Sequence, residues 1–250
     1  MTAVREKKPF FIRYTFKFED GTQKVFEACL DSKTLRVGTT PGPAPDWARL
    51  EYSQCEGCSL EPAKHPCCPV AVNFAEIVDA FKNIVSIRMA DIIVEMEERT
   101  ISKKTAVQNG LSSLMGIYMV ASGCPIMEKL KPMVRTHLPF ATSEETIYRT
   151  MTMYLGAQYF RMKKGLSQDW ELSQLYRLYE MVRNVNIGFA ERLQKASRED
   201  SIRNSISHLD VYAVLLNVGA LKKVDSLEYL FAPYLESAGE IQPGDKKDAV

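Results

Sequence analysis

Near its N-terminus the chain has two runs in which hydrophobic and polar side chains alternate, the pattern of a half-buried β-strand. One face of each run is apolar, with Ile12, Tyr14, Phe16 and Phe18 in the first and Phe26, Ala28 and Leu30 in the second. Glu19-Asp20-Gly21 lies between them. A three-residue loop with Gly21 in the left-handed conformation sets Tyr14 opposite Phe26, whereas a two-residue loop would mix the faces. The pattern therefore predicts an antiparallel hairpin in the first of these registers.

Three shorter stretches are predicted to add strands to this hairpin. Thr34–Val37 comes first, and an irregular loop rich in proline follows it over residues 39–46. Ile84–Met89 and Ile92–Met96 are rich in β-branched side chains, and Ala90-Asp91 is a plausible tight connection between them. We expect these stretches to complete an N-terminal sheet, and we expect no strand from about residue 103 onward.

Helical spacing first appears directly after Cys68. The apolar residues recur at i, i+4, i+7, i+8 and i+11, the pattern of a buried helix face: Val70, Phe74, Ile77, Val78 and Phe81. Pro69 suits the first helical position, where its missing N–H leaves no hydrogen bond unmade. Cys68 is therefore predicted to occupy the N-cap.

Helical patterns fill the chain beyond residue 103. Thr105 with Gln108, and Thr142 with Glu145, have the spacing of capping boxes and predict two helix starts. Gly165 predicts a helix end. A helix of about thirty residues should follow it, with shorter helices near residues 210–219 and 226–236. Its apolar face is predicted to contain Leu172, Leu175, Tyr179, Val182, Phe189 and Leu193.

These elements predict an α+β protein in which an antiparallel sheet with one helix precedes a helical bundle. We expect a β-rich part over residues 1–102, with a cysteine-rich loop at 53–69, and a bundle over residues 103–236. Residues 237–250 are polar and predicted to be disordered. The two parts should share a core or a broad interface.

Composition narrows the range of partners. The hydrophobic fraction is 46%, the charged fraction is 25% and the formal net charge is +1. A nearly neutral chain lacks the basic surface on which nucleic-acid binding depends, so we expect no nucleic acid. No apolar run approaches the ~20 residues that span a bilayer, and the N-terminus lacks the apolar core of a signal peptide. We therefore expect a cytoplasmic protein that does not enter membranes.

Four of the six cysteines lie between positions 55 and 68, together with one of the three histidines. In a reducing compartment, closely spaced thiols indicate metal or redox chemistry rather than structural disulfides. Cys-x-x-Cys lets two thiolates reach one metal, and a tetrahedral zinc ion needs four such ligands. The candidate ligands in this loop are Cys55, Cys58, His65, Cys67 and Cys68. Because adjacent side chains point in different directions, the sequence leaves open whether Cys67 or Cys68 faces the site.

Cys124 adds a distant candidate ligand. Cys68-Pro69 and Cys124-Pro125 share one arrangement, a cysteine at a predicted helix start with proline after it. Helix N-termini stabilise negative charge, which suits an anionic thiolate-ligated cluster. A distant ligand followed by proline resembles the ligand usage of bacterial ferredoxins, although the ferredoxin run of cysteines is absent. Iron–sulfur cluster and Zn²⁺ both remain open as the cofactor, with the cluster favoured.

The sequence thus favours a metal- or cluster-binding protein with a redox-responsive or scaffold role. One alternative is a structural-zinc module whose Met- and Tyr-rich helical surface recruits a protein partner. Another is a thiol oxidoreductase that uses Cys55 and Cys58, or Cys124 as a nucleophile. Since the chain has no nucleotide-binding or hydrolase motif, whether it is an enzyme stays open, as do its partner and oligomeric state. His137 extends an apolar helix face and is expected to have a packing role.

Overall fold

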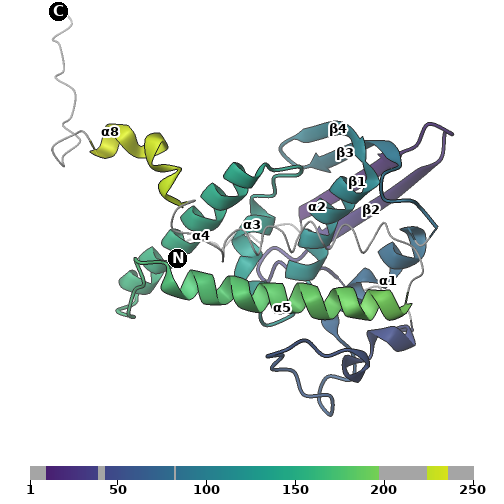
Figure 1. Ribbon diagram of the computed structural model, residues 1–250, viewed down its shortest axis with the longest axis horizontal. Coiled ribbons are helices and arrows are strands. Elements are labelled where there is room, and N and C mark those ends of the chain that lie inside the picture. The colour runs from purple at the N-terminus through teal and green to yellow at the C-terminus, as the bar shows by residue number, and fades with distance from the viewer. Residues whose placement is uncertain (1–9, 39–42, 82, 197–223, 236–250) are drawn as a thin grey trace, which may run out of the picture.

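A computed structural model describes residues 10–38, 43–81, 83–196 and 224–235. A four-stranded antiparallel sheet with the order β2-β1-β3-β4 is followed by helices (Figure 1), so the protein is α+β as the sequence predicts. Within the described ranges, no helix combines the length and the apolar character needed to span a membrane. The helix predicted near residues 210–219 and the tail from residue 237 lie outside these ranges.

The N-terminal hairpin has the predicted register. β1 (Phe10–Lys17) pairs with β2 (Gln23–Leu30) so that Tyr14 faces Phe26 and Ile12 faces Ala28. Gly21 has a φ of 82°, the left-handed conformation that the three-residue loop requires. The buried face of the hairpin is therefore set by the alternation of its side chains.

In the other half of the sheet, the strands differ from those predicted. β3 spans Met89–Met96, so Ala90 and Asp91 lie inside a strand, and residues 84–88 form turns rather than a strand. β4 (Thr100–Ala106) was not predicted, because Lys103 and Lys104 interrupt its apolar pattern. Among the described strands it pairs with β3 alone, and lysines on such an edge strand discourage pairing with other chains. Thr34–Val37 forms no strand, and Val37 makes only a single bridge to Leu30.

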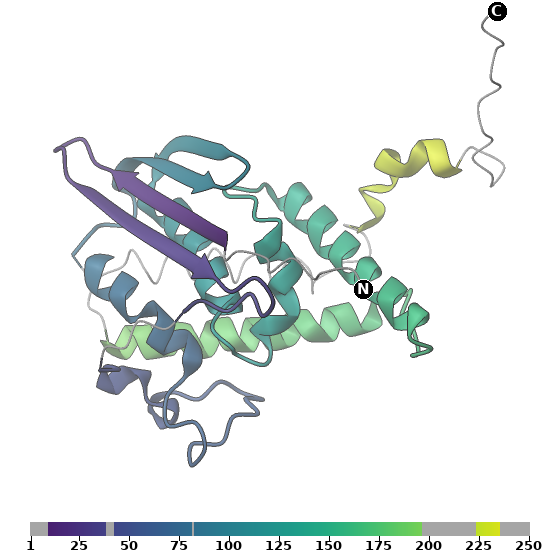
Figure 2. The ribbon, with the colours of Figure 1, turned by 180° about the vertical axis from the view of Figure 1, so that it is seen from behind.

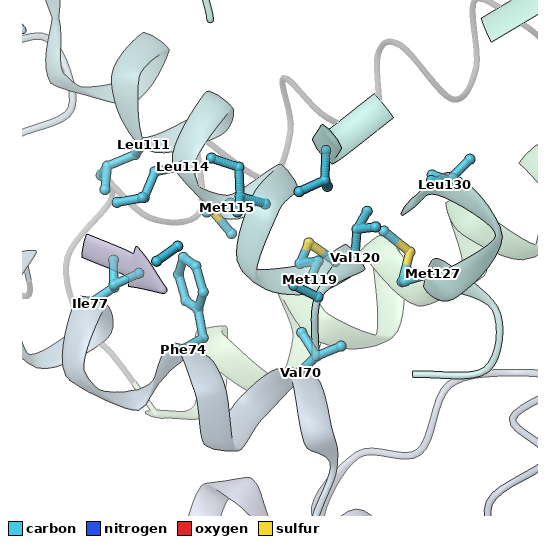
Figure 3. Packing of buried hydrophobic residues seen from close by; sticks show 14 of the residues in the cluster. Val70, Phe74, Ile77, Leu111, Leu114, Met115, Met119, Val120, Met127 and Leu130 are labelled. Atoms are coloured by element: carbon cyan, nitrogen blue, oxygen red, sulfur yellow. The ribbon is translucent and has the colours of Figure 1, made fainter. Parts of the chain in front are cut away.

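Two helices pack under the sheet. α1 (Pro69–Phe81) begins at the predicted proline, and α2 (Val107–Val120) follows β4 directly. Figure 3 shows Phe74 and Ile77 of α1 pointing toward Leu111 and Leu114 of α2. The predicted Thr105 capping box is wrong, because Thr105 belongs to β4 and no side chain caps α2.

The remaining described elements are helices. They are η1 (Asp46–Ala48), η2 (Leu50–Tyr52), η3 (Met127–Leu130), α3 (Lys131–Arg135), α4 (Ser143–Lys163), α5 (Ser173–Ala196), η4 (Glu228–Phe231) and α8 (Ala232–Leu235). Of these, η1 and η2 precede α1 and the others follow α2. The capping box of Thr142 and Glu145 is confirmed at the start of α4. Gly165, with a φ of 67°, follows the end of α4 as predicted.

One buried cluster runs from the sheet through α1 and α2 to α5, so the β-rich and helical parts share a core. α5 runs along the length of the molecule (Figures 1 and 2), and the segment of residues 43–68 lies against it on the side away from the sheet. The cysteine-rich loop therefore contacts a helix more than a hundred residues away in sequence.

Candidate metal centre

Four cysteines from three segments line one narrow pocket. Cys55 and Cys58 come from the loop, Cys68 precedes α1, and Cys124 lies between α2 and η3. The pocket has a volume of about 20 Å³, and α5 supplies one wall of it. All six cysteines of the chain are free thiols. The structure thus brings together the thiols of the loop, the thiol at the start of α1 and the thiol of the distant Cys-Pro pair.

The other two candidate ligands lie elsewhere. Cys67 is half-buried and does not line the pocket, and its backbone forms an isolated bridge with Arg49. His65 is exposed and does not line the pocket. Since Cys68 is the member of the adjacent pair that lines the pocket, the structure distinguishes the two neighbours by position. Cys29 is exposed on β2, where its thiol donates to the carboxylate of Glu27 at 3.3 Å.

Backbone N–H groups point at two of the pocket thiols. Burial raises the pKa of Cys68, while hydrogen bonds from the N–H groups of Ala71 and Val70 act in the opposite direction. Burial also raises the pKa of Cys124, again opposed by two backbone N–H groups, those of Met127 and Ile126. A cation bound in the pocket would offset the cost of burying charged thiolates. The N–H groups would then stabilise these thiolates by hydrogen bonding.

Cys55 is the thiol whose ionisation is most strongly opposed. Burial, together with the neighbouring Cys68, Cys58 and Cys124, raises its pKa to about 12. A thiol with such a pKa is a poor nucleophile at neutral pH, since the thiolate is the reactive species. A bound metal reverses this balance, because coordination deprotonates the thiol outright.

Arg192 of α5 lies in the wall of the same pocket and is 1% exposed. Its guanidinium donates to the carbonyl oxygens of Arg49 at 2.6 Å, Leu50 at 3.3 Å and Ser53 at 2.6 Å, and also to that of Trp47. Among the residues that the structure describes, no carboxylate forms an ion pair with it. A buried cation with only neutral partners is costly, so this side chain calls for an anion nearby.

Sequence reasoning missed Arg192, although a signal was present. Val185, Phe189 and Arg192 recur at i, i+4 and i+7, so the arginine continues a buried helix face. A charged residue on an apolar stripe marks either an ion pair or a site, and the pattern alone does not say which.

Gly188 allows α5 to approach the cysteine loop. A Cβ atom at this position would lie 2.9 Å from the Sγ and 3.0 Å from the Cα of Cys55. Its carbonyl oxygen also accepts a hydrogen bond from the Ser53 hydroxyl at 3.5 Å. Any larger residue would push the loop away from the helix.

The four thiols do not converge on a single point. In the described part of the chain, no group of three or more His, Cys, Asp or Glu side chains is placed to hold one metal ion. Tetrahedral zinc bonds of about 2.3 Å would require the sulfurs to be roughly 4 Å apart. The sulfur ligands of a [4Fe–4S] cluster lie farther apart than those of a zinc ion, since each of the four thiolates binds a different iron atom.

Comparison with known protein families matches residues 12–232 to a family described as "Domain of unknown function (DUF6901)". The chain belongs to the DUF6901 family. The matched range contains all four pocket cysteines and Arg192. No curated protein and no solved structure matches the chain.

Proposed function

We propose that this DUF6901 protein binds a thiolate-ligated metal centre through Cys55, Cys58, Cys68 and Cys124. The observation that carries the proposal is a charge relationship: a fully buried guanidinium and four thiols line one pocket that has no carboxylate in its described lining. If the four thiols were neutral, the described lining would supply no anion for Arg192. Four thiolates around a divalent ion or a cluster core carry net negative charge and would supply one.

An iron–sulfur cluster is the first candidate for this centre. Its support is the four thiols from three segments that line one pocket, and the backbone N–H groups at Cys68 and Cys124. Hydrogen bonds to cysteine sulfurs, together with burial, set the reduction potential of a cluster. With such a centre the protein would have a redox-responsive or scaffold role, in a reducing compartment that we take to be the cytoplasm.

Structural zinc is the second candidate, and the size of the pocket favours it. A volume of about 20 Å³ accommodates one ion or water, whereas a cluster would require the loop to move outward. A zinc centre here would fasten the loop to α1 and α5, which leaves function to the helical surface and a protein partner. The raised pKa of Cys55 and of Cys124 makes a thiol oxidoreductase the weaker alternative.

Metal and sulfide analysis of protein purified without air tests the proposal. A cluster would give iron with acid-labile sulfide and broad visible absorption, while zinc would give a colourless protein with one ion per chain. Cys→Ser variants at positions 55, 58, 68 and 124 should each lose metal. Cys67→Ser, Cys29→Ser and His65→Ala are the controls, because these residues do not line the pocket, and should retain it. A protein without bound metal, or equal loss in ligands and controls, would overturn the proposal.

A further inference from the structure

A second and larger cavity lies between α2, α4 and α5, and it neighbours the cysteine pocket along α5. Its volume is about 420 Å³, within the range of small-molecule sites in proteins. Val182 and Asn186 of α5 face this cavity, whereas Val185 and Phe189 of the same helix face the cysteine pocket. None of the six cysteines is among its described lining residues.

Asn186 is an unsatisfied polar group in the wall of this cavity. Its side chain is 2% exposed, and its Oδ1 atom has no hydrogen-bond partner within the described structure. Leaving a buried amide oxygen unpaired is unfavourable, because the oxygen has given up its hydrogen bonds to water. A ligand or a water in the cavity could supply the missing hydrogen bond, which a closed apolar core could not.

Arg149 gives the cavity a positive charge. Its Nη2 atom donates to the carbonyl oxygens of Met133 at 2.9 Å and Thr136 at 2.8 Å, and no carboxylate among the described residues forms an ion pair with it. Glu145 is close enough to influence Arg149, but it is engaged in the capping box and does not line the cavity. Planar guanidinium groups with free donors are the preferred partners of carboxylate and phosphate.

Other lining residues add to the positive potential of the cavity. Lys103 lines the cavity, with its ammonium 5.9 Å from the ring centre of Phe140. Thr142 and Thr146 place the N-terminus of the 21-residue helix α4 at the wall, where the helix dipole favours negative charge. No acidic side chain is among the described lining residues. The lining also contains apolar side chains, among them Ile117, Val120, Leu130, Val134 and Leu138.

We propose that this cavity binds a small amphipathic anion, a molecule with a carboxylate or phosphate group on an apolar body. The anionic group would lie near Arg149 and Lys103, and the apolar body would cover the wall formed by Ile117, Val120 and Leu130. Asn186 would accept a hydrogen bond from a hydroxyl or N–H group on the ligand. This site does not depend on the metal centre, since none of its described lining residues is a pocket cysteine.

Calorimetric titration of the full chain with three eight-carbon probes tests this proposal. Octanoate and octyl phosphate carry the anionic group, and octanol is the neutral match. We expect at least one anion to bind about tenfold more tightly than octanol, because a charge-assisted hydrogen bond is stronger than one between neutral groups. The two anions also separate a carboxylate ligand from a phosphate ligand.

Variants locate the binding. Arg149→Gln and Lys103→Gln should each weaken anion binding and leave octanol unaffected, whereas Arg177→Gln on the exposed face of α5 should change neither. Lys103 lies on an exposed strand, so its variant keeps the test open if Arg149→Gln does not fold. The proposal is overturned if neither anion binds, if octanol binds as tightly, or if both cavity variants bind the anions like the unmodified chain.

Discussion

The guanidinium of Arg192 donates a 2.6 Å hydrogen bond to the backbone carbonyl of Ser53, two residues before Cys55. Three further carbonyl oxygens, those of Trp47, Arg49 and Leu50, accept from the same group. One side chain of α5 therefore fixes the path of the segment that leads into the cysteine loop. It holds that segment and contributes a positive charge to the pocket at the same time.

Removing this side chain should damage both the fold and the proposed metal centre. We expect Arg192→Met to lower the free energy of unfolding by about 3 kcal/mol, because buried carbonyl groups lose their donors, and to reduce bound metal. Arg192→Lys keeps the charge but not the planar fork, so its loss should be intermediate. Urea unfolding and metal analysis measure the two effects. Arg177→Lys is the surface control, and metal retained in full by Arg192→Met would contradict the charge argument.

Two helix glycines give a matched test of the contact between α5 and the loop. Gly188→Ala places a Cβ against Cys55, so we expect a destabilisation of about 1–3 kcal/mol and a loss of metal. Gly156→Ala in α4 meets no atom within 4 Å and should stabilise the helix by up to about 1 kcal/mol. Thermal unfolding of both variants, with metal content, compares them. Equal behaviour of the two alanines would show that the close approach at Gly188 has no consequence.

The half-buried imidazole of His137 should make stability depend on pH. Burial lowers its pKa to about 3, and its Nε2 lies 2.6 Å from the hydroxyl of Tyr14. The unfolded chain takes up a proton near pH 6.5 and the folded chain does not, so stability falls as the pH drops from about 6.5 toward 3.

His137→Gln removes this titration. Over that interval its unfolding free energy should fall less steeply than that of the unmodified chain, by up to about 1.4 kcal/mol per pH unit. Urea titrations at a series of pH values give the two slopes. Parallel slopes would mean that His137 takes up a proton in the folded state.

The start of α4 offers a test of local stability. The Thr142 side chain accepts from the backbone N–H of Glu145 at 3.2 Å, and Glu145 accepts in return from the backbone N–H of Thr142 at 2.7 Å. Thr142→Ala should therefore lower the unfolding free energy by about 1 kcal/mol. Thr152→Ala, within the same helix, removes a hydroxyl that bonds only to helix carbonyls and should have a smaller effect. Denaturant midpoints compare the two, and a larger effect at Thr152 would contradict the role of the cap.

The sequence predicted the elements whose side-chain pattern has a single physical solution. The hairpin register followed from the alternation around Gly21, and Pro69 marked the start of α1. β4 was missed because an edge strand is half solvated, so its lysines obscure the alternation. The false strand at Ile84–Met89 shows the opposite error, since a short apolar run does not reveal its backbone conformation.

The site was predictable only in part. The sequence indicated the cysteine loop and Cys124, because closely spaced thiols and repeated Cys-Pro pairs are uncommon. It did not select Cys68 over Cys67, and it did not connect Arg192 to the loop, since both depend on how α5 packs. The cavity at Arg149 and Asn186 left no signal, because its polar residues are scattered among ordinary helical positions.

The walls of the pocket come from positions 50–70, 124–126 and 185–192. The pocket can therefore form only late in biosynthesis. Chains fold progressively from the N-terminus as they emerge from the ribosome. Cys55, Cys58 and Cys68 are made long before Arg192, so no nascent chain shorter than about 192 residues can close the pocket. During that interval the thiols are open to oxidation and to adventitious metals. Under the proposed function, metal loading would follow translation of α5, and a chain that stalls before this helix would present a cysteine loop without its anchor.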